Sequence, residues 1–404
     1  MSDKFILLKD LNQPRRSTGL SVPTRGLESL GPRLETEMPP EPFITEVALS
    51  PAELREAARD PDTLAIARSI PTKLIAPVEI EPSEETAANA TGPTWGVRAV
   101  RADQSQFDGS GVTVAVLDTG IDRQHPAFIG VSIIEEDFSG DGNGDVQGHG
   151  THCAGTIFGR DVDGQRIGVA PGVSTALIGK VLGNDGGGSS EMLFNGMEWA
   201  SRNNAQVISM SLGFDFPGLV DRLITNEGWP NDLAASAALE AYRMNFLMFE
   251  RLLSMIEARA AFNGGTVVVA ASGNESKRRI RSDYEVSASL PAATPGVVSV
   301  GAIGESPAGF QVASFSNTNP TLSGPGVNVV SAQSGGGLVA LNGTSMATPH
   351  VAGVAALWWQ AVRSQGIPVS SAAVNARLRS TTIRSGFAPE VEVLDRGDGL
   401  VQAP

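Results

Sequence analysis

The sequence has few of the residues on which disulfide-linked, basic or membrane-spanning proteins depend. Its 404 residues include a single cysteine, Cys153, so no disulfide can form within the chain. Lys and Arg number only 30 against 44 Asp and Glu, and the net charge of −14 disfavours a broad surface for nucleic acid or an anionic membrane. No apolar run approaches the ~20 residues that cross a bilayer. Because the first ten residues are charged on both sides of a short apolar stretch, we expect no secretory signal and a cytoplasmic location, with non-classical export left open.

The composition changes near residue 94. Residues 1–94 are rich in proline and charge, and within them residues 5–8 and 43–49 predict strands. Residues 51–59 predict a short helix, with Ser50 as its N-cap and proline at its first position. Residues 82–94 are small and polar, so they predict an exposed linker.

From residue 95 onward, short apolar runs alternate with helical stretches. Runs of the kind buried on both faces occupy residues 112–117, 207–210, 266–271 and 297–300. Residues 191–202 and 234–261 predict helices between them. This alternation predicts an α/β fold with a doubly wound, mostly parallel sheet. Since ligand sites of such sheets lie at the carboxyl ends of strands, we expect the chemistry just after these runs.

Four clusters of polar residues carry candidate chemistry. Asp118 ends the first apolar run, and Asn274 follows the third. His149 lies between two glycines, and Ser345 lies among small residues at the start of an apolar helix, near N–H groups that can stabilise an oxyanion. Pro349 is expected only in the first turn of that helix. Taken singly, each cluster also fits a turn or a helix cap.

Metal binding is the alternative for the histidine cluster. His149 and His152 are three residues apart and can share a helix face, but the glutamate of the zinc-protease pattern is absent. The preceding residues 141–145 imitate a calcium loop. Its sixth position is Val146 and its twelfth is His152, where an EF-hand needs Gly and Glu, so that interpretation fails.

In the chain order Asp, His, Asn, Ser, the clusters together resemble the subtilisin-like serine proteases (subtilases). The motifs that carry the resemblance are Asp-Thr-Gly-Ile-Asp from residue 118, Gly-His-Gly-Thr-His-Cys-Ala-Gly from 148 and Gly-Thr-Ser-Met-Ala-Thr-Pro-His-Val-Ala-Gly from 343. The resemblance covers about residues 95–404 and implies a serine endopeptidase. Ser345 would attack the peptide carbonyl, His149 would accept its proton, and Asp118 would orient the imidazole. Asn274 would bind the oxyanion together with the backbone N–H of Ser345. A non-catalytic peptide-binding protein and an esterase or acyltransferase stay open as alternatives.

The resemblance also implies where a polypeptide substrate binds. Segments 180–188 and 209–213 would flank it as neighbouring strands. The contacts expected there are Gly186, Gly187, Gly188, Ser211, Leu212 and Gly213. Ala271, Ser272 and Gly273 would wall the pocket for the side chain before the cut, with Glu275 at its rim. Cys153 is expected beneath His149 as a structural residue.

Three further expectations follow from the resemblance. Catalysis needs no cofactor, and structural calcium is in doubt because Ala127 replaces a common ligand, although Asp161 and Asp163 lie in the loop that supplies others. The long connection 214–263 is either a packed helix or a cap or partner surface near the cleft. Residues 1–94 resemble, more loosely, a subtilase pro-segment, a small α+β domain that would inhibit the cleft of a zymogen. An independent targeting or partner-binding domain is the alternative for residues 1–94.

Overall fold

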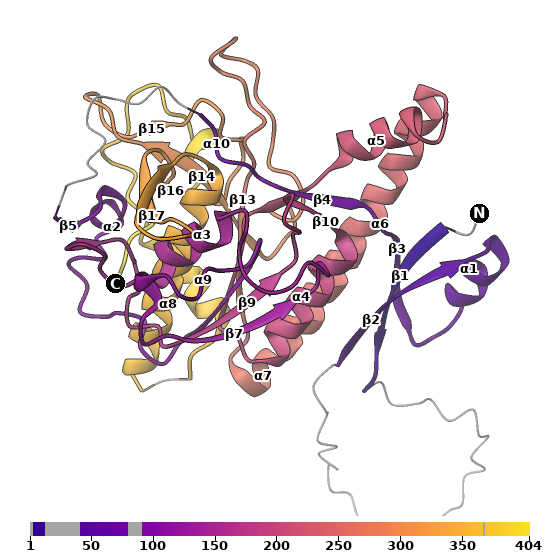
Figure 1. Cartoon of the computed structure of the whole chain (residues 1–404), viewed down its shortest axis with the longest axis horizontal. Helices are drawn as coiled ribbons and strands as arrows, with labels where there is room; N and C mark the ends of the chain where they lie inside the picture. The colour runs from indigo at the N-terminus through magenta and orange to yellow at the C-terminus, as the bar shows by residue number, and fades with distance from the viewer. Residues whose placement is uncertain (1–2, 13–40, 80–90, 367) are drawn as a thin grey trace, which may run out of the picture.

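The computed structural model describes residues 3–12, 41–79, 91–366 and 368–404. Its centre is an eight-stranded sheet, in the order β15-β14-β13-β11-β6-β9-β7, with β16 also paired to β14 (Figure 1). The strands are β6 (Thr113–Asp118), β7 (Ser132–Asp137), β9 (Thr175–Lys180), β11 (Val207–Met210), β13 (Val267–Ala271), β14 (Val297–Gly304), β15 (Gln311–Val312) and β16 (Leu322–Pro325). All pairs are parallel except β14 with β15. The predicted doubly wound, mostly parallel sheet is confirmed.

Alternate residues of β6 explain why helices cover both faces of the sheet. Val114 and Val116 pack in one apolar cluster with α3 (His149–Phe158) and α8 (Thr344–Ser364). Ala115 and Leu117 pack in a second cluster with α4 (Ser190–Arg202) and α6 (Asn231–Ala258). Because successive side chains of a strand point to opposite faces, an uninterrupted apolar run buries both.

The remaining elements are short and connect or flank these layers. They are β5 (Gly92–Pro93), α2 (Trp95–Ala99), η1 (Pro126–Phe128), β8 (Gln165–Arg166), β17 (Val329–Ala332), β18 (Leu338–Leu341), α9 (Ser371–Ser380) and α10 (Val393–Arg396). The expected linker is thus partly wrong, since β5 lies within it and pairs with β8, while residues 82–90 lie outside the described part of the chain. No helix among the described residues is long and apolar enough to cross a bilayer.

The described part of the N-terminal region, residues 3–12 and 41–79, forms a separate small sheet. Its strands run antiparallel in the order β2 (Pro42–Leu49), β1 (Asp3–Asp10) and β3 (Thr63–Arg68). Strand β4 (Pro71–Leu74) follows in the chain and belongs to another sheet. Helix α1 (Pro51–Ala57) begins after Ser50, whose hydroxyl and backbone N–H exchange hydrogen bonds with Glu53 in a capping box.

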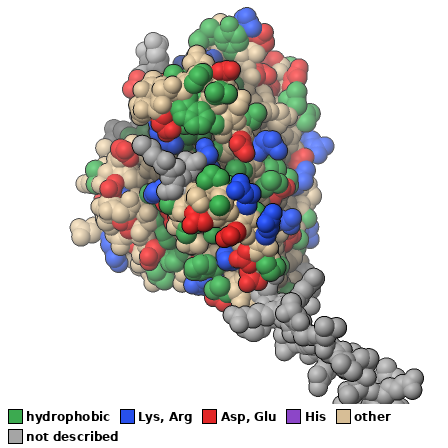
Figure 2. Space-filling model, turned by 90° about the vertical axis from the view of Figure 1, so that its right-hand side faces the viewer, with side chains coloured by type: hydrophobic (Ala, Val, Ile, Leu, Met, Phe, Trp, Pro, Cys, Tyr) green, Lys and Arg blue, Asp and Glu red, His purple; other side chains and the backbone are tan. Residues whose placement is uncertain are grey.

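On the face of the molecule shown in Figure 2, Lys and Arg side chains lie among Asp and Glu side chains.

The long connection 214–263 holds α5 (Phe216–Thr225), α6 and α7 (Ala260–Asn263). The helix predicted over 234–261 is therefore two helices, and the first begins three residues earlier than expected. Helix α6 runs between the central sheet and the N-terminal sheet in Figure 1, and it packs against β3. Ile6 and Leu8 of β1 belong to the same apolar cluster as Met248 and Phe249 of α6. The connection is thus a packed helix whose outer side carries the N-terminal sheet.

Candidate active site

The four candidate residues meet at the carboxyl edge of the central sheet. Asp118 is the last residue of β6, His149 is the first of α3, Ser345 is the second of α8, and Asn274 lies three residues beyond β13. Asp118, His149 and Ser345 are at most 1% exposed. Since parallel strands all end at the same edge, residues far apart in the sequence converge there.

Asp118 fixes the orientation of His149. The Nδ1–H of His149 donates to Oδ1 of Asp118 at 2.8 Å, and the backbone N–H of Thr119 donates to the same oxygen at 2.8 Å. Burial lowers the pKa of His149, but the carboxylate of Asp118 and the nearby Cys153 outweigh this effect and hold the pKa well above 6.5. Burial also raises the pKa of the Cys153 thiol, so this group stays neutral. The negative charge beside His149 is therefore the carboxylate of Asp118. Among the described residues, Nε2 of His149 has no hydrogen-bond partner.

Asp145 holds the start of the histidine helix, a role that the sequence did not suggest. Its carboxylate accepts from Thr119 Oγ1 at 2.8 Å, from the N–H of Gly148 at 2.7 Å, and from Thr151 through N at 2.8 Å and Oγ1 at 2.6 Å. It therefore ties the loop after Asp118 to the first turn of α3. Asp145 lies just before α3, where an acidic side chain can cap a helix, so its position could have predicted this role. The resemblance of residues 141–145 to a calcium loop obscured that signal.

Lys180 is a second positioning group that sequence reasoning missed. Its side chain is 1% exposed, and its ammonium donates to three neutral oxygens. These are the carbonyls of Thr119 at 2.7 Å and Gly144 at 3.1 Å, and Oδ1 of Asn184 at 3.0 Å. A buried ammonium needs such partners, because an unpaired charge is very costly to bury. Lys180 therefore joins three loops around the carboxyl end of β6.

Pro349 is the sixth residue of α8, so the expectation of a first-turn proline is wrong. A proline has no N–H, so the carbonyl four residues earlier, that of Ser345, loses its helical partner. The thiol of Cys153 and the hydroxyl of Ser211 both donate to this carbonyl, at 3.4 Å each. Cys153 also lies 3.8 Å from Nδ1 of His149, which confirms its position beneath the ring.

The amide of Asn274 is oriented by the residue before Ser345. Its Oδ1 accepts from the N–H of Thr344 at 3.0 Å and from Thr344 Oγ1 at 2.9 Å. These two donors leave Nδ2 directed into the cleft, where it donates to the carbonyl of Ala76 at 2.9 Å. Asn274 is thus a rigid donor beside Ser345.

The cleft between the two predicted edge segments holds a strand of the chain itself. Strand β4 pairs antiparallel with β10 (Gly187–Ser189) on one side and with β12 (Leu212–Phe214) on the other. The N–H of Leu74 donates to Gly186 O at 2.9 Å, and the N–H of Ile75 donates to Ser211 O at 3.3 Å. All six predicted contacts therefore flank this strand: Gly186, Gly187, Gly188, Ser211, Leu212 and Gly213.

The predicted pocket wall lies beside Asn274. Ala271 and Ser272 are buried, and the N–H of Gly273 donates to Thr344 Oγ1 at 3.2 Å. Glu275 is exposed, as expected for a rim residue, but its carboxylate accepts from Asn317 Nδ2 at 2.7 Å. The carboxylate of Glu275 is therefore already hydrogen-bonded to Asn317.

The residues considered for metal binding lie in different surroundings. Asp161 and Asp163 are exposed, and the carbonyl of Ala127 accepts from the N–H of Arg160 at 2.7 Å. His152 does not share a site with His149, because its Nε2 faces the carbonyls of Val329 and Val339, at 3.0 and 3.3 Å. Within the described ranges, the one group of three or more metal-ligating side chains is Asp118, His149 and Cys153.

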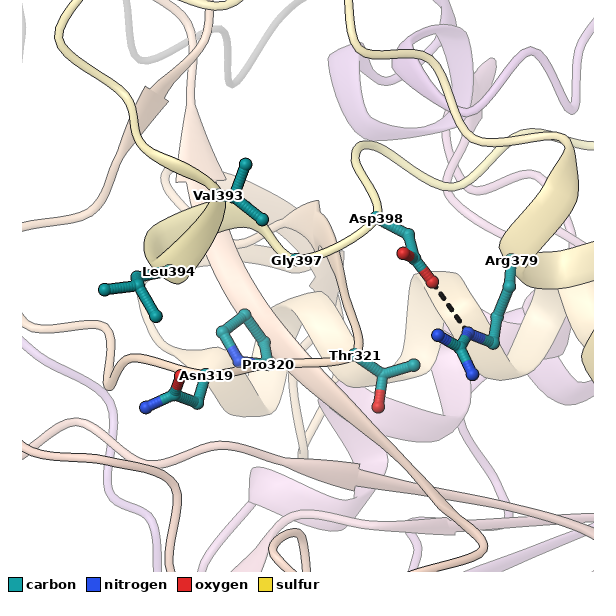
Figure 3. A pocket seen from close by; sticks show the side chains of 8 residues that line it. All are labelled: Asn319, Pro320, Thr321, Arg379, Val393, Leu394, Gly397 and Asp398. Atoms are coloured by element: carbon teal, nitrogen blue, oxygen red, sulfur yellow. Dashed lines mark hydrogen bonds and ion pairs between the residues drawn. The ribbon is translucent and has the colours of Figure 1, made fainter.

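A separate shallow pocket of about 330 Å³ shares no residue with this site (Figure 3). Its lining is Asn319, Pro320, Thr321, Arg379, Val393, Leu394, Gly397 and Asp398. Nε of Arg379 donates to Asp398 at 2.7 Å, so the two charges of the pocket neutralise each other.

Comparison with known proteins assigns the chain to one family. The sequence profile of the subtilase family matches residues 109–399. The chain belongs to the subtilase family. It is 32% identical to a thermostable alkaline protease of Halalkalibacterium halodurans over 368 residues, which covers 89% of this chain and 82% of that protein. It is 34% identical to subtilisin DY of Bacillus licheniformis over 301 residues, or 72% and 92% of the two chains. It is 35% identical to M-protease of Shouchella clausii over 332 residues, or 80% and 72%. This subtilase is a serine endopeptidase, and the family needs no cofactor for catalysis.

The expected cytoplasmic location is wrong. The relatives are secreted bacterial subtilisins and alkaline proteases, and they point to an extracellular location. The expectation relied on the first residues of the sequence, which do not decide where this subtilase is delivered.

Proposed function

We propose that this subtilase is a zymogen in which Asp118, His149 and Ser345 form the catalytic triad and Asn274 forms the oxyanion hole. The observation that carries the proposal is the strand β4 in the cleft, which leads to Ile75 and Ala76. The Oγ of Ser345 donates to the carbonyl of Ile75 at 2.8 Å, next to the bond from Asn274 to Ala76. A groove that holds an extended peptide against a buried serine is what an endopeptidase requires.

Each residue has a role in the reaction. Ser345 attacks the carbonyl carbon of a substrate while its proton passes to Nε2 of His149, and Asp118 stabilises the imidazolium through Nδ1–H. Nδ2 of Asn274 and the N–H of Ser345, in the first turn of α8, donate to the oxygen that becomes negative. His149 then gives the proton to the leaving amine, and water hydrolyses the acyl-enzyme by the reverse sequence.

The substrates are polypeptides that bind in extended form. Because β10 and β12 contact β4 through backbone groups, a substrate would pair with them without depending on its sequence, and side-chain pockets would add selectivity. The wall at residues 271–273, with Glu275 at the rim, would contact the side chain before the cut.

The N-terminal region is the intramolecular inhibitor of this site. We assign residues 1–94 to the pro-segment and linker and residues 95–404 to the protease domain, with 214–263 as an insertion that carries the pro-segment. Asn245 of α6 supports this assignment, since it is fully buried and its Nδ2 donates to Arg68 O at 2.7 Å at the end of β3. The N-terminal region is therefore bound to the rest of the protein in two places, through β3 at α6 and through β4 in the cleft.

The test is the intact mass of the full chain after incubation at neutral pH, beside the Ser345→Ala variant. We expect only the wild type to lose its N-terminal region, and we expect a fluorophosphonate probe to label Ser345 once that region is gone. A protein whose N-terminal region has been removed by an added protease, and which the probe still does not label, would be a peptide-binding protein without an activated serine.

A further inference from the structure

Lys73, in the strand that lies in the cleft, forms an ion pair with an acidic residue at the start of the long connection 214–263. Its Nζ lies 2.8 Å from Oδ1 of Asp215, the residue that follows β12 and caps α5. Strand β4 pairs with β10 and β12 through backbone groups, as an extended substrate would. Each side chain of β4 therefore occupies the place that a substrate side chain would take, and the ion pair indicates which kind of side chain one of these places accepts.

The backbone pairing alone brings these two side chains together. In the antiparallel register Lys73 lies opposite Gly213, and the N–H of Asp215 extends the pairing by one bond, to Pro71 O at 2.9 Å. Asp215 is thus the diagonal neighbour of Lys73 on the same face, at a separation that a long side chain can span. Because Gly213 has no side chain, the stem of the lysine can cross this position. A substrate strand in the same register would place its own side chain here.

The carboxylate of Asp215 is held in position by its own helix. As the N-cap of α5, it accepts from the N–H of Gly218 through Oδ1 at 3.2 Å. A Cβ at residue 218 would collide with Oδ2 of Asp215, so the glycine leaves the space that the carboxylate occupies. The side chain of Asp215 is 22% exposed, and salt screens a partly buried charge less than a fully exposed one. When the N-terminal region leaves the cleft, Lys73 leaves with it, and this oriented anion faces the position of a substrate side chain.

We propose that Asp215 is a specificity-determining residue, which selects substrates with Lys or Arg two residues before the residue whose carbonyl Ser345 attacks. The register comes from Ile75, which follows Lys73 by two residues and whose carbonyl accepts from Ser345 Oγ at 2.8 Å. The inference rests on the proposed function and deepens it by naming a class of substrate, extended polypeptides with a basic side chain at this position. The insertion 214–263 thus contributes a substrate contact in addition to carrying the N-terminal sheet.

The experiment measures kcat/KM on three blocked peptide p-nitroanilides, in which the anilide fixes the position of the cut. The first is Thr-Lys-Leu-Ile, the sequence of residues 72–75, and the others carry Gln or Glu in place of Lys. The enzymes are the wild type, Asp215→Asn and the control Asp221→Asn, which removes the same charge from an exposed residue of α5. Each is made as the full chain, and its N-terminal region is removed by an added protease that is then withdrawn by its affinity tag. Asn is as good an N-cap as Asp, so Asp215→Asn keeps the start of α5.

We expect the wild type to prefer the Lys peptide to the Gln peptide by ~3- to 5-fold at low salt, with the Glu peptide cut most slowly. The preference should shrink in about 1 M NaCl, because salt screens the pair. In Asp215→Asn the three peptides should be cut at nearly equal kcat/KM, whereas Asp221→Asn should keep the wild-type order.

The proposal is overturned if the wild type cuts the three peptides equally, or if Asp215→Asn and Asp221→Asn change the preference to the same extent. Fluorophosphonate labelling of the same preparations separates this result from a failure of the proposed function. Labelled Ser345 in a wild type that does not distinguish the peptides rejects the role of Asp215 and leaves the proposed function intact. A wild type that neither labels nor cuts any peptide rejects the proposed function, and the role of Asp215 with it.

Discussion

Acidification should destabilise this subtilase through two buried histidines other than His149. Burial lowers the pKa of His152 to about 3 and that of His350 to about 4. His350 is 1% exposed, with Nδ1 donating to Met346 O at 2.8 Å and Nε2 against Gly96. The unfolded chain takes up these protons near pH 6.5, whereas the folded protein does not until pH 3–4. In that window the unfolded state binds more protons, so stability falls as pH falls.

The size of the effect follows from these pKa values. Between pH 6.5 and pH 5.0 each histidine costs the folded state about 1.6 kcal/mol, or about 3 kcal/mol for both. That is a large part of the roughly 5–15 kcal/mol that stabilises a typical folded domain. His149 adds little in this range, because its raised pKa leaves it protonated in both states below pH 6.5.

Urea unfolding of Ser345→Ala, which cannot digest itself, measures the effect at the two pH values. We expect the free energy of unfolding to fall by about 3 kcal/mol, and by about half as much when His350→Gln is added. Carboxylates titrate equally in both proteins, so the difference between them isolates His350. A fall of equal size in both proteins would refute the assignment of a buried, neutral His350.

Three further predictions concern the proposed site. Asn274→Ala should lower kcat by ~10²–10³ with little change in KM, measured on a peptide substrate, because the lost donor acts mainly in the transition state. Asp118→Asn should lower kcat/KM by ~10⁴ and move the acid limb of its pH profile to lower pH, because the carboxylate raises the pKa of His149 and the base works only when deprotonated. An unmoved acid limb would contradict this. Lys180→Met should lower the free energy of unfolding by about 2–4 kcal/mol, because three buried oxygens lose their donor. Lys73→Met, at a lysine that is 45% exposed, is its control and should change stability by less than ~1 kcal/mol.

The sheet edge and the residues on it could be predicted because their signals are local. An apolar run such as 112–117 must be buried on both faces, and a polar residue at its end must then lie at the edge where the other strands end. Lys180 gives no such signal. Its three acceptors come from loops around residues 119, 144 and 184, which are separate in the sequence and adjacent only in the folded protein.

The expectation that Pro349 lies in the first turn of its helix is wrong for a similar reason. The rule that excludes proline from a helix interior assumes that the freed carbonyl finds no other donor. Cys153 and Ser211 supply those donors from two other segments, and no property of residues 343–353 foretells them.

The docked N-terminal sheet should help to hold β4 in the cleft. A few backbone bonds would hold this strand only weakly, but Ile6 and Leu8 are fully buried in the cluster that includes α6, and this docking keeps the strand close to the cleft. Asn245→Ala tests this contribution, since it removes the donor to Arg68 O and leaves β4 unchanged. A lost buried hydrogen bond costs about 1–3 kcal/mol, so docking should weaken ~5- to 150-fold.

The readout is the rate at which fluorophosphonate labels Ser345 in the chain before it is cut. It should rise in Asn245→Ala and stay at the wild-type value in Asn203→Ala, which changes an asparagine at the exposed end of α4. Asn245→Ala should open the cleft because the sheet that holds β4 in place is docked more weakly. An uncut Asn245→Ala chain that labels no faster than the wild type would mean that β4 alone holds the cleft closed.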